Sequence, residues 1–149
     1  MIRKDKHLPL ATTLLVLLLI FIWGNSLLPA EISAAISGWV WELLGDFSGG
    51  ELIFDGTMGD GPLRKTAHFI EFASLGMVLL WIMILLRKHP LLALAGGFAA
   101  ACIDETIQLF VPGRGPAFTD VLLDTSGVLA GVLILTLIHY WRRNHIIEN

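Results

Sequence analysis

The chain has 149 residues, of which 55% are hydrophobic and 15% are charged, and its formal net charge is −3. With a mean hydropathy of +0.73, the sequence leaves little room for a water-soluble domain. We therefore expect one all-α integral membrane domain over residues 1–149, with no nucleic-acid partner.

Four apolar runs predict a bundle of four transmembrane helices. They span residues 8–28, 66–86, 91–111 and 119–141. Each run is long enough for a tilted helix to cross about 30 Å of hydrocarbon. The first run follows three basic residues, as the apolar part of a signal peptide would. No small-x-small cleavage site comes directly after it, so we expect an uncleaved first helix.

The segment between the first two spans predicts an extracytoplasmic amphipathic helix. Pro29 ends the first span, and apolar residues then recur at helical spacing: Ile32, Ile36, Trp39, Val40, Leu43 and Phe47. Such a helix would lie at the membrane surface, although a lid packed on the bundle would show the same pattern. A turn-rich loop, Asp55–Pro62, follows.

The basic residues predict the orientation of the bundle. Seven of the ten flank one side of the four spans: Arg3, Lys4, Lys6, Arg87, Lys88, Arg142 and Arg143. By the positive-inside rule this side is cytoplasmic. We expect a multi-pass protein of the inner (cytoplasmic) membrane with both termini in the cytoplasm.

Ten polar residues near the opposite side predict a pocket that faces outward. They are Arg64, Lys65, His68, Glu71, Asp104, Glu105, Gln108, Arg114, Asp120 and Asp124. Their spacing puts those of each span largely on one face and at similar depth. A carboxylate in hydrocarbon costs several kcal/mol unless it meets a partner or water. The carboxylates outnumber the nearby cations, which favours a functional pocket over the alternative, a buried network that only holds the helices together.

The residue types indicate acid–base and anion-binding chemistry. His68 with Glu71 at i+3 suits an oriented acid–base pair, and arginine binds phosphate in a bidentate manner. The candidate catalytic residues are His68, Glu71, Asp104, Glu105 and Asp120. The candidate ligand-binding residues are Arg64, Lys65, Gln108, Arg114 and Asp124. The same histidine and carboxylates are an alternative divalent-cation site, although the sequence does not name a metal.

Three blocks of the sequence resemble the signature of the VanZ-like membrane proteins. They are Lys65-Thr66-Ala67-His68-Phe69-Ile70-Glu71-Phe72, Asp104-Glu105-x-x-Gln108 with Pro112-Gly113-Arg114, and Asp120-x-x-x-Asp124-x-x-Gly127. This chain has Asp124 where that family typically has Asn. The motif positions carried over are Lys65, His68, Glu71, Glu105, Gln108, Arg114 and Asp120. The resemblance implies a small multi-span envelope protein, and the namesake is associated with low-level resistance to teicoplanin.

Together these features predict a pocket that acts on or binds an amphipathic, phosphate-bearing envelope molecule. The expected partner is a membrane lipid or a lipid-linked molecule, and the resemblance suggests a link to glycopeptide resistance. An enzyme would use the pocket for catalysis, and a structural, binding or modulating protein would use the same residues for recognition alone. The sequence leaves this choice and the oligomeric state open.

Overall fold

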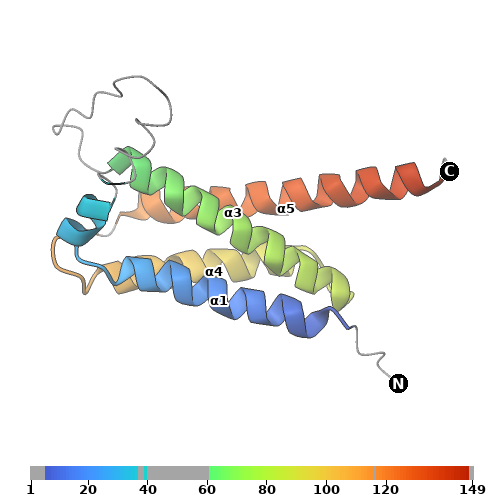
Figure 1. Cartoon of the computed structure of the whole chain (residues 1–149), viewed down its shortest axis with the longest axis horizontal. Helices are drawn as coiled ribbons and strands as arrows, with labels where there is room; N and C mark the ends of the chain where they lie inside the picture. Colours follow the sequence, from blue (N-terminus) through green and yellow to red (C-terminus); the bar gives the residue numbers. More distant parts are fainter. Residues whose placement is uncertain (1–5, 37–38, 40–60, 116, 148–149) are drawn as a thin grey trace.

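The computed structural model describes residues 6–36, 39, 61–115 and 117–147, and every long element in this part of the chain is an α-helix (Figure 1). Four long helices follow one another: α1 (Leu8–Ser26), α3 (Gly61–Leu85), α4 (Leu91–Gln108) and α5 (Phe118–Ile147). Each is long and apolar enough to cross a membrane. The predicted all-α architecture with four spans is therefore confirmed.

The helix boundaries differ from the predicted spans by a few residues. α1 ends at Ser26, and α4 ends at Gln108 where the apolar run continued to position 111. Proline disfavours a helical conformation in the residue before it, so Pro112 ends the run. Gly113 follows in the left-handed region with φ of 75°, which glycine adopts readily. α5 runs six residues further than predicted, to Ile147.

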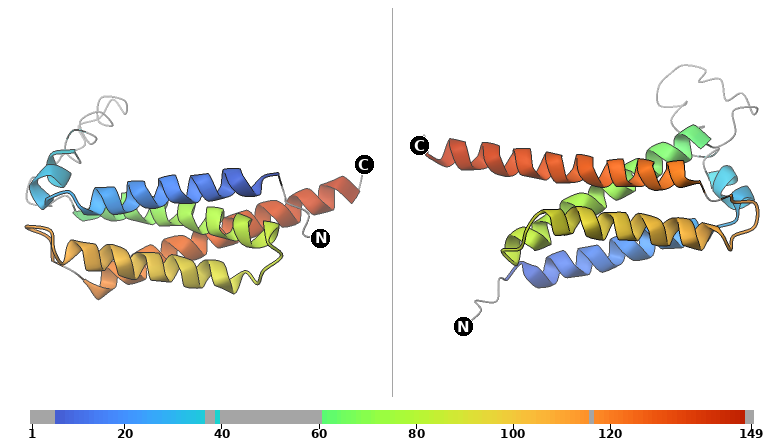
Figure 2. Two further views of the ribbon diagram at one scale, coloured as in Figure 1. Left: turned by 90° about the horizontal axis from the view of Figure 1, so that it is seen from below. Right: turned by 180° about the vertical axis from the view of Figure 1, so that it is seen from behind.

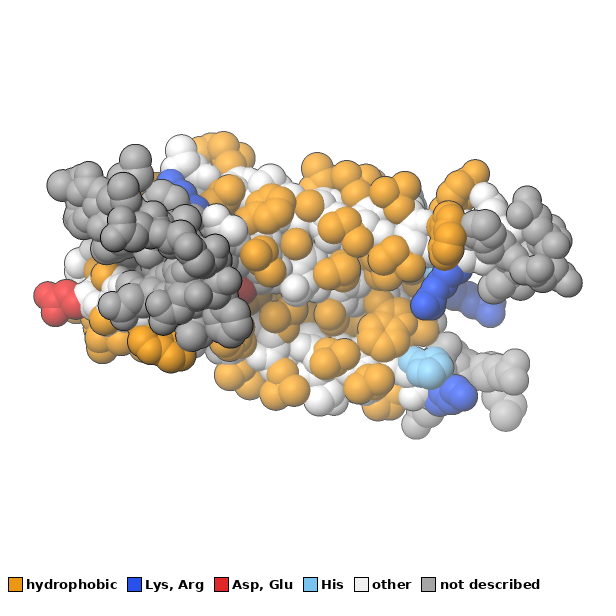
Figure 3. Space-filling model, turned by 45° about the horizontal axis from the view of Figure 1, so that its top comes forward, with side chains coloured by type: hydrophobic (Ala, Val, Ile, Leu, Met, Phe, Trp, Pro, Cys, Tyr) orange, Lys and Arg blue, Asp and Glu red, His pale blue; other side chains and the backbone are white. Residues whose placement is uncertain are grey.

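The bundle is organised around α3, which packs against α1, α4 and α5 (Figures 1 and 2). Its residues Phe72 and Leu75 are fully buried beside Ile22 of α1, Ala101 of α4 and Val128 of α5. Most large apolar side chains instead face outward, and Figure 3 shows them covering the middle of one face. An apolar exterior around a thin core is the arrangement expected of a bundle in lipid.

Glycines bring α3 and α5 into close contact. A Cβ atom on Gly127 would lie 2.6 Å from the carbonyl oxygen of Phe69, and one on Gly131 would collide with the carbonyl oxygen of Ala73. The Gly127-x-x-x-Gly131 pair thus lets the two backbones approach, as small residues do between membrane helices. This contact fixes how α5 is rotated against α3, and so which of its side chains meet those of α3.

The helix ends that carry the polar residues gather at one end of the bundle, which we call the pocket end (Figures 1 and 2). The start of α1 and the end of α5 lie at the opposite end. A short helical stretch, residues 30–36, follows Pro29 at the pocket end, and the Ala30 amide donates to the carbonyl oxygen of Pro112 at 3.4 Å. The rest of the predicted amphipathic segment, Trp39 excepted, and most of the loop after it lie outside the described residues.

Candidate functional site

A polar pocket lies at the pocket end, between α3, α4 and α5. It is lined by Arg64, Lys65, His68, Glu105, Gln108, Asp120, Leu123 and Asp124. Seven of these eight residues belong to the set predicted from the sequence. The pocket is small: its cavity volume is about 10 Å³, roughly what one water molecule requires. Its size suits an ion, and a larger group enters it only in part.

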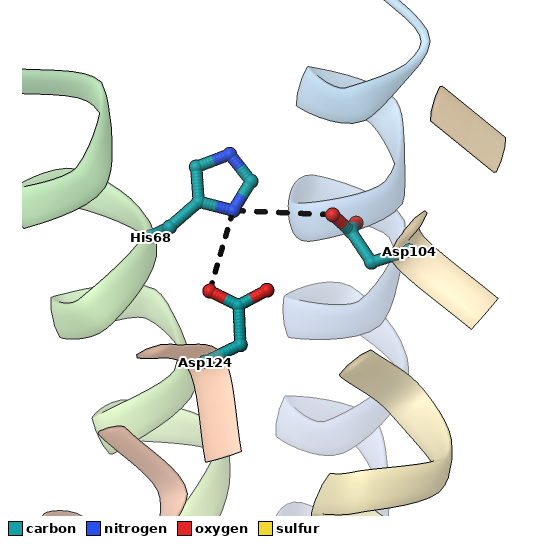
Figure 4. A group of neighbouring side chains, drawn as sticks. All are labelled: His68, Asp104 and Asp124. Carbon is teal, nitrogen blue, oxygen red and sulfur yellow. Dashed lines mark ion pairs between the residues drawn. The ribbon is translucent and has the colours of Figure 1, made fainter. Parts of the chain in front are cut away.

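Three side chains from three helices converge beside the pocket. His68 of α3 points its Nδ1 atom toward Asp104 of α4 and Asp124 of α5 (Figure 4). The Nδ1 atom lies 3.9 Å from Asp104 Oδ2 and 3.8 Å from Asp124 Oδ1. Asp104 is fully buried and Asp124 is 1% exposed. Potential ligand atoms of the three residues lie within 4.8 Å of one another, close enough to share one metal ion.

Two hydrogen-bond donors hold Asp104 in place. The Ser26 hydroxyl donates to Asp104 Oδ2 at 2.9 Å, and the Gln108 amide donates to the same oxygen at 2.8 Å. Ser26 is itself fully buried at the end of α1. The first helix therefore contributes to the polar cluster, which the sequence analysis assigned to the other three helices only.

The remaining carboxylates of the set also have partners. Glu105 Oε2 accepts a hydrogen bond from the Ala117 amide at 3.0 Å, just before α5. Asp120 Oδ1 lies 3.2 Å from Lys65 Nζ, and half of the Lys65 side chain is exposed. Glu71 Oε1 accepts from the Asn25 amide of α1 at 3.0 Å. These contacts tie α1 to α3, α3 to α5, and α4 to α5.

Glu71 and Arg114 lie outside the pocket lining. The sequence spacing predicted a pair of His68 and Glu71, but Glu71 accepts its hydrogen bond from Asn25 of α1. The carboxylates beside the His68 imidazole are those of Asp104 and Asp124. Arg114 Nη2 donates to the carbonyl oxygen of Asn25 at 3.3 Å, near the end of α1. The same carbonyl oxygen also accepts from the Leu28 amide at 3.1 Å, and the dipole of α1 favours a cation near its last turn.

Several buried carboxylate oxygens have no hydrogen-bond partner among the described residues. They are Glu71 Oε2, Asp104 Oδ1, Glu105 Oε1 and both oxygens of Asp124. A buried, unsatisfied polar group costs about 1–3 kcal/mol, and more if it is charged. The contacts described above satisfy one oxygen in each of four carboxylates, those of Glu71, Asp104, Glu105 and Asp120. Asp124 has only the His68 imidazole, whose Nδ1 lies 3.8 Å from Oδ1, beyond hydrogen-bond distance. The pocket therefore offers acceptors for a donor or a cation.

The contribution of α1 could have been read from its last turn. Asn25 and Ser26 are adjacent polar residues at the end of an otherwise apolar run, and they bond to Glu71 and Asp104. The Ala117 amide had no such signal, because the residue type says nothing about where a backbone donor points.

Comparison with known proteins relates most of the chain to one family. The model of the family described as VanZ/LLP1 matches residues 11–139, a range that includes every candidate site residue. No curated protein sequence matches the chain. No solved structure matches it either.

Proposed function

The chain belongs to the VanZ/LLP1 family, and we propose that its pocket binds the phosphate group of an amphipathic envelope molecule, either a membrane lipid or a lipid-linked compound. It is a multi-pass membrane protein with four candidate spans. VanZ is associated with resistance to the glycopeptide teicoplanin. A pocket that binds a lipid headgroup would let this chain act on the lipids of the cell envelope, where glycopeptides also act.

The orientation is part of the proposal. Arg87 and Lys88 lie in the turn between α3 and α4, and Arg142 and Arg143 lie near the end of α5, away from the pocket. Figure 3 shows basic side chains at that end, beyond the apolar band. By the positive-inside rule this end lies in the cytoplasm and the pocket opens on the outer surface of the inner membrane.

The observation that carries the proposal is the position of two cations beside a small pocket in an apolar surface. Arg64 and Lys65 both line the pocket, and an arginine fork can hold two phosphate oxygens at once. Phe118 and Leu122, which are 73% and 52% exposed, lie on the same part of α5 as Asp120. A phosphate could thus sit at the mouth of the pocket beside Arg64 and Lys65, while its hydrocarbon chain stays in the bilayer against these side chains.

Binding is the step that an enzyme and a non-enzymatic recognition protein would share. A catalytic role is favoured by one observation: the His68 imidazole lies between two buried carboxylates, an arrangement that suits proton transfer or cation chemistry. If the bound molecule is turned over, release of inorganic phosphate or of a shortened product should depend on His68. If the protein only recognises its ligand, the bound molecule should be recovered unchanged.

The binding test compares three probes in detergent solution: a polyprenyl monophosphate, the polyprenol of the same chain length, and inorganic phosphate. We expect the phosphorylated lipid to bind at least about tenfold more tightly than the alcohol, a difference of about 1.4 kcal/mol. Inorganic phosphate should compete weakly, because it lacks the apolar chain. Equal affinity for the lipid and the alcohol would contradict the proposal.

Two variants separate a specific phosphate contact from general charge. Arg64→Gln should remove the preference for the phosphorylated lipid, whereas Arg64→Lys should keep part of it, because lysine retains the charge but loses the fork. Arg142→Gln is the matched control, since Arg142 is an exposed arginine far from the pocket. A similar loss in Arg142→Gln would show that binding follows net charge.

A further inference from the structure

We propose that His68, Asp104 and Asp124 together hold one divalent cation, next to the phosphate-binding part of the pocket. The three residues come from α3, α4 and α5 and point toward a common centre (Figure 4). The ion would join three of the four long helices at the depth of the pocket.

The distances between the side chains suit a shared ion better than direct hydrogen bonds. The two separations of 3.8 and 3.9 Å from His68 Nδ1 exceed the roughly 2.7–3.2 Å of N–H···O hydrogen bonds. Ligand atoms at about 2.1 Å from a tetrahedral ion lie about 3.4 Å apart. Around a metal, the two distances from His68 would shorten by about half an ångström, and the widest separation in the cluster, at most 4.8 Å, would shorten by no more than about 1.4 Å.

The second observation is that the carboxylates are buried without sufficient donors. Asp124 is 1% exposed, and neither of its oxygens has a hydrogen-bond partner among the described residues. Asp104, which is fully buried, has the same deficit at Oδ1. A divalent ion would neutralise both charges and use these oxygens as ligands. Buried charges in proteins are normally paired or bound to metals.

The surroundings of the three residues match those of known metal ligands. Asp104 Oδ2 is oriented by Ser26 and Gln108, as ligating carboxylates usually are. Three protein ligands leave at least one position on the ion open, as in catalytic metal sites. One imidazole and two carboxylates suit Mn²⁺, Fe²⁺ or Zn²⁺, whereas Cu(I) and iron–sulfur clusters prefer sulfur ligands.

The ion would also explain how an acidic pocket binds an anion. This bridging role of the ion rests on the proposed binding of a phosphate group. Glu105, Asp120 and Asp124 line the pocket beside only two permanent cations, Arg64 and Lys65. The Lys65 charge is already paired with Asp120. A divalent ion held by His68, Asp104 and Asp124 would offset this excess of negative charge and bind a phosphate oxygen at its open position.

The first experiment measures the metal itself, without lipid. Protein purified with a chelator and then transferred to chelator-free buffer is titrated with Mn²⁺ and with Zn²⁺, and bound metal is counted after desalting. We expect one saturable equivalent per chain. In the Mn²⁺ form, pulsed electron spin resonance should detect coupling to an imidazole nitrogen that is lost in His68→Asn. Absence of a saturable equivalent, or a bound ion without nitrogen coupling, would overturn the site.

Matched variants test the residue assignment. Asp124→Asn keeps the shape of the side chain and should lower the affinity for the metal by at least about tenfold. Ser26→Ala should lower this affinity within the roughly 10–100-fold range typical of residues that orient a ligand. Asp120→Asn removes the same charge one helical turn away and should cost clearly less. Equal losses in Asp120→Asn and Asp124→Asn would show that general acidity holds the ion, which would overturn the assignment.

The last experiment separates the cation site from the proposed function. Binding of the polyprenyl monophosphate is measured with the metal-loaded protein and with the chelated protein. We expect at least about tenfold tighter binding when metal is present. Equal binding in both forms would overturn the bridging role while leaving phosphate binding intact. Stoichiometric metal without any lipid binding would contradict the proposed function and leave the cation site standing.

Discussion

Replacing Asp124 by Asn should stabilise the metal-free protein. The carboxylate is 1% exposed, and neither oxygen has a hydrogen-bond partner among the described residues. Asparagine has nearly the same shape but carries no charge, and its amide provides a donor. Asp104 Oδ1 is a buried acceptor of the same cluster that also has no such partner. The His68 Nδ1 atom lies 3.8 Å from Asp124 Oδ1, beyond hydrogen-bond distance. The substitution therefore removes a charge that has no hydrogen-bond partner among the described residues and adds a group that the cluster can use.

The size of the effect follows from the cost of a buried, unsatisfied polar group. This cost is about 1–3 kcal/mol, so Asp124→Asn should raise the free energy of unfolding of the chelated protein by a similar amount. For a chain of this length each kcal/mol shifts the unfolding temperature by roughly 2–4 °C. Saturating cation should then reverse or narrow the difference, since a ligand at 100 times its dissociation constant adds about 2.7 kcal/mol to the protein that binds it.

Thermal unfolding in detergent, followed by circular dichroism with chelator and with Mn²⁺, measures both effects. The wild type should gain stability on addition of Mn²⁺, and Asp124→Asn should gain much less. If Asp124→Asn unfolds at a lower temperature than the wild type in chelator, Asp124 must make a favourable contact in the metal-free protein. The reasoning from its unpartnered oxygens would then be refuted.

Two further predictions concern the bundle. Gly131→Ala should lower the free energy of unfolding by about 1–3 kcal/mol, because the new Cβ would collide with the backbone of α3. Gly24→Ala is the control, since a Cβ there meets nothing within 4 Å. Equal unfolding temperatures of the two variants in detergent would contradict the close contact between α3 and α5. In a Cys102→Ala background, a membrane-impermeant maleimide should label cysteine at position 115 from outside intact cells and at position 88 only after permeabilisation, and the opposite pattern would reverse the orientation.

The sequence predicts the four spans well because their length and hydrophobicity are set by the bilayer. Where a predicted helix boundary is wrong by a few residues, the cause is the local backbone conformation. Pro112 and Gly113 end α4 at Gln108, although the apolar run continues to position 111. The packing of α5 on α3 is also readable, since Gly127 and Gly131 recur at an interval that marks one face of a helix.

Helical spacing also predicts which residues line the pocket, but it does not predict which of them contact one another. Spacing along α3, α4 and α5 places their polar residues on common faces, and seven of the ten predicted residues line the pocket. Before its last turn α1 is apolar on nearly all sides, so its sequence does not indicate which face is buried. Asn25 and Ser26 show that α1 has polar groups at this depth, but their partners depend on how the helix is rotated. The pairing of His68 with Asp104 and Asp124 depends on three helices at once.

The most direct test of phosphate binding at this end of the bundle is photochemical crosslinking. A polyprenyl monophosphate with a photoreactive group next to the phosphate is bound to the protein in vesicles, and crosslinked peptides are identified by mass spectrometry. We expect labelling within residues 64–68, 104–108 and 118–124, and we expect an excess of the unmodified lipid to suppress it and Arg64→Gln to reduce it. Labelling spread along the apolar faces of the helices, or concentrated at the Arg87–His89 end, would contradict this expectation.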